Sequence, residues 1–113
     1  DNKQHMRQNY IEVVGVIGFV GEMKTFRTGT KLTEVGLYVR KNQKSSGNEE
    51  NSSLSFSLKF WNELADMAVN QLRSKLILGV NGRFDVETYT KRSGELVTKC
   101  VIHVAHIELA PNL

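Results

Sequence analysis

The sequence has little of three residue types: one cysteine, one proline and one tryptophan occur among its 113 residues. The single cysteine, Cys100, excludes an internal disulfide framework and favours a reducing compartment. No apolar run approaches the length of a membrane-spanning helix, so we expect no membrane as a partner. Excess charge is also small, because the formal net charge is +3. That mildly basic balance is compatible with an anionic partner.

Motifs for catalysis are missing as well. There is no Gly-x-Ser-x-Gly nucleophile elbow, no Gly-Lys-Ser/Thr phosphate loop and no evident pair of catalytic carboxylates. We therefore expect a binding protein rather than an enzyme, and no cofactor. Three potential metal ligands, Cys100, His103 and His106, lack a fourth ligand and do not share one face of a strand. We therefore expect no metal site, and a packing role for Cys100.

The length of the chain is that of one domain with a single core. The chain begins with Asp1 rather than Met, and residues 1–9 are mostly polar. We expect this segment to be disordered, or to be a processed or engineered start. The folded domain is then expected to span residues 10–110.

The segment ending at Trp61 alternates strictly between apolar and polar residues. Phe56, Leu58 and Phe60 share one face of a predicted strand, and Lys59 and Trp61 share the other. The apolar face must be the buried one, which leaves the indole of Trp61 on a polar surface beside a lysine. An aromatic side chain next to a cation is typical of a surface on which nucleic-acid bases stack.

The whole chain shows a strand-rich order with one helical run. Strands are expected at 10–20 and 31–41, after the loop and ending at Trp61, and at 76–90 and 96–109, with a helix capped by Asn62 and a polar, mobile loop at 42–53. Glycines within the first strand indicate close backbone approach, as at a barrel corner. This order predicts an all-β fold: a five-stranded OB-fold barrel with one α-helix between strands 3 and 4. An α+β sandwich is the alternative.

Four segments carry a family resemblance, and together they reach from Tyr10 to Leu109. These are Val-Val-Gly-Val-Ile-Gly at 13–18, Phe-Trp-Asn-Glu-Leu-Ala-Asp at 60–66, Gly-Val-Asn-Gly-Arg-Phe at 79–84, and Tyr89 with Ser93-Gly94. The set resembles bacterial and mitochondrial single-stranded DNA-binding proteins. The resemblance implies a homotetramer that binds single strands with little sequence preference. It also implies replication or repair proteins as partners. The expected location is an organellar nucleoid, mitochondrial rather than chloroplast, or alternatively the bacterial cytoplasm.

The candidate binding residues fall into two groups. Trp61 and Tyr89 match stacking aromatics of that family, and Tyr38 projects outward and could replace a lost one, since two other family tryptophans fall near Gln43 and Ser55. The candidate phosphate contacts are Lys59, Arg40, Lys41, Arg83, Lys91, Arg92 and Arg27. Asp85 and Glu87 share a strand face with Arg83 and Tyr89, where we expect them to repel a phosphate backbone.

We therefore predict a protein that coats and protects single-stranded DNA in replication, recombination and repair. Two alternatives stay open. One is an RNA-binding or replication-restart OB module with similar residues. The other is a degenerate barrel that binds proteins, which the two carboxylates and the missing tryptophans favour.

Overall fold

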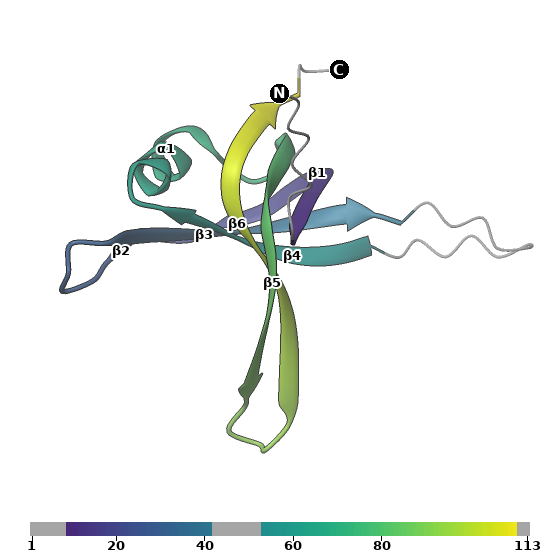
Figure 1. Cartoon of the computed structure of the whole chain (residues 1–113). Coiled ribbons are helices and arrows are strands. Elements are labelled where there is room, and N and C mark those ends of the chain that lie inside the picture. Colours follow the sequence, from purple (N-terminus) through teal and green to yellow (C-terminus); the bar gives the residue numbers. More distant parts are fainter. Residues whose placement is uncertain (1–8, 42–52, 111–113) are drawn as a thin grey trace, which may run out of the picture.

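The computed structural model describes residues 9–41 and 53–110. The predicted segment 1–9 and the predicted loop 42–53 therefore lie outside the described residues, apart from Asn9 and Ser53. The elements are β1 (Tyr10–Val20), β2 (Lys24–Thr25), β3 (Lys31–Arg40), β4 (Ser53–Trp61), α1 (Glu63–Gln71), β5 (Ile77–Thr90) and β6 (Leu96–Leu109) (Figure 1). The five long strands and the helix follow the predicted order. The short strand β2 was predicted only as part of a connection, and it pairs with the start of β3.

The five long strands close into a ring. β1 pairs with both β3 and β5, β5 with β6, β6 with β4, and β4 with β3. The β4–β6 pairing is parallel and the others are antiparallel. Each long strand thus has two neighbours over part of its length, whereas β5 and β6 pair only with each other in the hairpin beyond Asp85. This closed sheet with a helix between its third and fourth long strands is the OB-fold, and the sandwich alternative was wrong.

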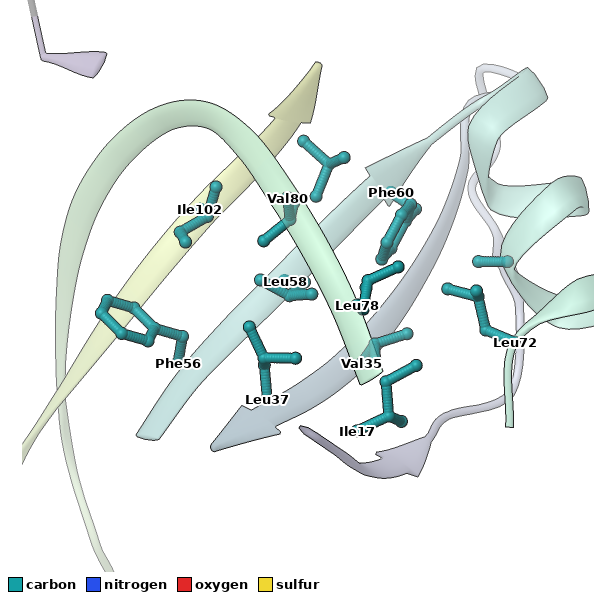
Figure 2. Close-up of a cluster of buried hydrophobic side chains, with 12 residues drawn as sticks. Ile17, Val35, Leu37, Phe56, Leu58, Phe60, Leu72, Leu78, Val80 and Ile102 are labelled. Carbon is teal, nitrogen blue, oxygen red and sulfur yellow. The ribbon is translucent and has the colours of Figure 1, made fainter. Parts of the chain in front are cut away.

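The core fills the ring with side chains from alternate positions of every long strand. β4 supplies Phe56, Leu58 and Phe60, as the alternation predicted, and all three are buried. Figure 2 shows them facing side chains of β1, β3, β5 and β6, with Leu72 closing the end of the cluster beside α1. Burial of each such side chain contributes about 1.5–3 kcal/mol to folding. The same alternation places Lys59 and Trp61 on the outside of the ring.

A bulge in β1 changes which residues face outward. The β1–β3 register shifts between Ile17 and Phe19, so Ile17 is buried whereas Phe19 is exposed. The ring of Phe19 covers Gly36 on β3, and the ring of Tyr38 covers Gly18 on β1, so closely that a Cβ atom at either glycine would clash. The predicted close backbone approach is confirmed at Gly15 of β1, where a Cβ atom would lie 2.5 Å from the carbonyl oxygen of Tyr38. Both aromatic rings are exposed on the outer surface.

The start of α1 differs from its prediction. Asn62 is the N-cap residue, but its side chain makes no capping hydrogen bond, and its φ is +55°. Its Oδ1 instead accepts a hydrogen bond from the backbone N–H of Lys31, 3.2 Å away. The Thr33 hydroxyl, which is fully buried, donates to the carbonyl of Ala65 at 3.0 Å. The helix is thus fastened to β3, directly beyond Trp61.

Candidate nucleic-acid interface

A groove of about 700 Å³ lies on the outer surface of the ring. Its walls come from the end of β1 and the connection that follows it, from β3 and β4, and from the β5–β6 hairpin. Phe19 and Met23 line one side, and Tyr89 and Lys99 line the side formed by the hairpin. Phe19 is 54% exposed and Tyr89 is 49% exposed. The groove therefore offers two accessible aromatic rings from separate elements.

A network of ions lies between these aromatics. Glu34 on β3 accepts hydrogen bonds from Lys99 Nζ at 3.0 Å and from Ser57 Oγ at 3.1 Å. Partial burial alone would raise the pKa of the Glu34 carboxyl, but these two donors, the charge of Lys99 and the charge of Lys59 together lower it. Glu34 is thus held as a paired carboxylate, and its negative charge is matched before any ligand arrives.

A second pair lies further along β4. Lys59 Nζ is 2.8 Å from Glu87 Oε2, and only 14% of the Lys59 side chain is exposed. The sequence placed Lys59 correctly on the outer face but predicted it as a phosphate contact. In the structure its ammonium is already bound to a carboxylate, and Glu87 is matched by the same pair.

Trp61 ends β4 and contacts β6. Its Nε1–H donates to Nδ1 of His103 at 3.0 Å, and the planes of the two rings are 19° apart. His103 Nε2 lies 3.5 Å from Asp85 Oδ2. The pKa of the Asp85 carboxyl is lowered, first by the backbone N–H of Val86 and then by His103. Trp61, His103 and Asp85 thus form one chain of contacts from β4 to β6 to β5.

Two residues of this candidate interface were missed by the sequence analysis. His103 was weighed there only as a metal ligand. Its outward position follows from the parallel pairing of β4 with β6, which brings Lys59 opposite it. Phe19 was missed because strict alternation from Ile17 would point it inward, and only the bulge turns it outward. The signal available in the sequence was the glycine at position 18, next to Phe19.

The predicted cations are exposed but dispersed. Arg40 and Lys41 lie at the end of β3, Lys91 and Arg92 lie in the β5–β6 turn, and Arg27 lies in the β2–β3 turn. Figure 1 shows that these three places project from the ring in different directions. Lys91 is 3.9 Å from Glu95, with both side chains more than half exposed. Of these exposed cations, Arg83 lies opposite His103 on β5, just as the paired Lys59 lies opposite His103 on β4.

The described parts of the chain contain no group of three His, Cys, Asp or Glu residues able to hold a metal ion. Cys100 is half-buried and lines the groove. Within residues 9–41 and 53–110, no helix has the length and apolar character needed to cross a membrane.

Comparison with known proteins matches the chain to one family, and the similar proteins have names that agree with that family. Residues 8–110 match the model of the "Single-strand binding protein family". A "Single-stranded DNA-binding protein 1" from Synechocystis sp. is 30% identical over 105 residues, which are 92% of this chain and 84% of the relative. A protein of the same name from Nostoc sp. is 27% identical over the same shares.

Solved structures agree on the fold. A small single-stranded DNA-binding protein from Streptomyces coelicolor has a TM-score of 0.72 at 20% identity, over 93% of this chain and 96% of that one. The protein PriB from Ralstonia solanacearum has a TM-score of 0.64 at 12% identity, over 92% and 100%. At such identities the likeness extends to the fold alone.

Proposed function

This chain belongs to the single-strand binding protein family, and from that premise we propose that it coats single-stranded DNA through the outer surface of its ring. The observation that carries the proposal is the groove, which presents Phe19 on one side and Tyr89 on the other. Aromatic rings stack with any base, and each stacked base contributes about 1–3 kcal/mol. Binding is therefore largely independent of base sequence and involves no catalysis.

The proposed path of the strand crosses more than the groove. Tyr38, 44% exposed, lies beside Phe19 on the outer surface, and Trp61 lies along β4 beyond Ser57 and Lys59. We assign these side chains to base stacking together with Phe19 and Tyr89. The exposed cations assigned to phosphates are Arg40, Lys41, Arg83, Lys91, Arg92 and Arg27. Lys59 has a lesser role, because Glu87 already holds it.

We also propose that the protein is a homo-oligomer, most simply a tetramer. Support comes from the outer face of β1, where Val14 is 61% exposed and Val16 is also exposed. Ile77 on β5 lies opposite Val16 and is exposed too. A contiguous apolar patch of this kind marks an interaction surface. Several barrels joined together would bind one strand more tightly, because linked sites raise the effective concentration.

The proposed location is a compartment that holds DNA undergoing replication or repair. The relatives with sequence likeness come from bacteria, which favours the bacterial cytoplasm over the mitochondrial nucleoid. Replication or repair proteins as further partners are part of the same proposal. The family match favours DNA over the RNA-binding, replication-restart and scaffold alternatives.

The test is binding of fluorescently labelled oligo-dT at low salt, measured by anisotropy. Oligo-dT should also quench the tryptophan fluorescence, which reports only Trp61 when tryptophan is excited selectively. The variant Trp61→Ala should weaken binding by about 1–3 kcal/mol per protomer. Phe26→Ala is the matched control, because Phe26 is an exposed aromatic in the β2–β3 turn that does not line the groove and is not assigned to base stacking.

Three results would contradict the proposal in different ways. Equal affinity of Trp61→Ala and the unchanged protein would remove Trp61 from the interface. Preference for oligo-rU in competition would favour the RNA alternative, because the sugar 2′-hydroxyl distinguishes the two polymers. No binding of any oligonucleotide at low salt would favour the protein scaffold.

A further inference from the structure

The hydrogen bond between Trp61 and His103 fixes the protonation of the imidazole. An indole N–H can only donate, so His103 Nδ1, 3.0 Å away, must accept with a free lone pair. This bond requires a neutral imidazole whose hydrogen is on Nε2, the atom that lies 3.5 Å from the Asp85 carboxylate. A protonated imidazole carries hydrogen on both nitrogens and cannot accept this bond.

The same bond sets the plane of the indole without covering its faces. An indole N–H lies in the plane of its ring, so Nδ1 must lie near that plane. Because the ring planes are 19° apart and the ring centroids 6.1 Å apart, the parallel rings are offset so far that they meet edge to edge. Stacking with a base uses the face of a ring and not its edge. His103 thus restricts the rotation of Trp61 while leaving stacking possible.

We propose that His103 is a positioning residue for single-strand binding: its neutral imidazole holds the Trp61 indole in the orientation that receives a base, and protonation of His103 releases it. The inference rests on the function proposed above. A side chain held in its binding rotamer loses less conformational entropy when the ligand arrives, so affinity should fall when the hold is lost.

The charged groups around His103 come from two strands. Asp85 and Arg83 face it from β5, and Lys59, in register with it on β4, is paired with Glu87. On protonation, the imidazole gains an ion pair with Asp85 through Nε2 and loses the Trp61 bond at Nδ1. The carboxylate thus offers the protonated ring a partner on the side away from Trp61. The side chain of His103 is 17% exposed, so solvent protons reach it.

The experiment measures oligo-dT affinity from pH 8 to pH 5 at constant ionic strength, the range in which imidazoles titrate and thymine does not. The full chain is compared with His103→Asn, His103→Leu and His106→Asn. An asparagine oxygen can accept from the indole at the Nδ1 position but cannot be protonated, whereas leucine fills space without accepting. His106→Asn is the matched control, because His106 lies on the same strand but pairs with Asn81, away from Trp61.

The unchanged protein should bind about two- to tenfold more weakly at pH 5 than at pH 8, the effect of one net hydrogen bond. His106→Asn should show the same profile. His103→Asn should lose the pH dependence and bind more tightly than His103→Leu at pH 8. In the free protein, the emission of Trp61 should titrate over the same range, and this titration should be absent in His103→Asn.

Several outcomes would overturn the inference while leaving the proposed function intact. Affinity that is constant or rises toward pH 5 would mean that His103 contributes at most a positive charge. A pH dependence that survives in His103→Asn, or that disappears in His106→Asn, would mean that a group other than His103 causes it. Absence of binding at every pH would instead overturn the proposed function. If His103→Leu fails to fold, the profiles of the unchanged protein and His103→Asn still decide.

Discussion

The pair formed by Lys59 and Glu87 changes how the outer face should interact with phosphate. A carboxylate 2.8 Å from an ammonium cancels most of the field that would attract an anion. The sequence analysis treated Glu87 only as a source of repulsion and Lys59 only as a source of attraction. Because the two side chains are in contact, a change in either one alters the charge that the other presents to a phosphate. The two effects must therefore be tested together.

We expect Glu87→Gln to tighten binding of oligo-dT, because it removes a negative charge and frees Lys59 for a phosphate. The gain should reach up to about fivefold at 50 mM salt, the scale of one partly exposed ion pair. It should shrink at 200 mM salt, where screening shortens the range of the charge. Anisotropy titrations at both salt concentrations measure it.

Glu108→Gln is the control, since Glu108 carries the same charge on β6 but lies opposite Gly79, near the β1 face. Equal tightening in both variants would mean that the effect comes from the net charge of the protein alone. Weaker binding of Glu87→Gln would mean that the carboxylate orients Lys59 for its contact.

At the level of single side chains, the sequence predicts what depends on local alternation and misses what depends on pairing. Trp61 and Tyr38 were placed on the outer face because apolar residues occupy every second position of β4 from Phe56 and of β3 from Val35 to Val39. The contact between Trp61 and His103 spans 42 residues and depends on the register of two parallel strands. No local pattern encodes that register. Phe19 was missed because a single bulge inverts the alternation after Ile17.

Among the elements, long strands were predictable and the short features were not. Strands of nine residues or more carry enough alternation to be recognised, and all five were found. β2 has two residues and no pattern of its own, and it forms because its chain turns back along β3. Asn62 was recognised as the start of α1, but the partner of its side chain, the backbone of Lys31, comes from β3 and could not be deduced locally.

The outer face of β1 gives an element-level prediction about assembly. We expect Val14→Lys to shift the protein toward smaller species at micromolar concentration. The reason is that an ammonium would replace a side chain whose full burial contributes about 1.5–3 kcal/mol at each copy of an interface. Light scattering or sedimentation measures the change. The unchanged protein should have the mass of several chains.

Thr88→Lys is the control, because Thr88 is exposed on the part of β5 that pairs with β6 in the projecting hairpin, distant along the strand from Ile77. It adds the same charge without touching the β1 face. The assembly proposal would be refuted by a monomer mass for the unchanged protein. An unchanged oligomer in Val14→Lys would place the interface on another surface.

At the scale of the whole molecule, shape and charge are linked. The ring carries three projections, and most of the exposed candidate cations lie on them: Arg27 on one, Arg40 and Lys41 on another, Lys91 and Arg92 on the third (Figure 1). A strand that passes over the ring from one projection to another meets aromatic rings in the middle and cations at the ends. Stacking energy is then concentrated near the groove, while electrostatic attraction is spread over the span.

This arrangement predicts a specific salt dependence. If about four phosphates are neutralised per protomer, the slope of log affinity against log salt should be about −3 for a single strand. Affinity should then fall roughly 50-fold between 50 and 200 mM salt, on the same basis. Removing the two cations of the β5–β6 turn together, with Lys91→Gln and Arg92→Gln, should reduce the magnitude of the slope by about 1.4.

Trp61→Ala should weaken binding at every salt concentration and leave the slope unchanged, because stacking releases no counterions. A slope near zero in the unchanged protein would mean that phosphates contribute little. A slope altered by Trp61→Ala would mean that the indole also controls where the backbone of the strand lies, so that stacking and phosphate contacts could no longer be treated as separate contributions.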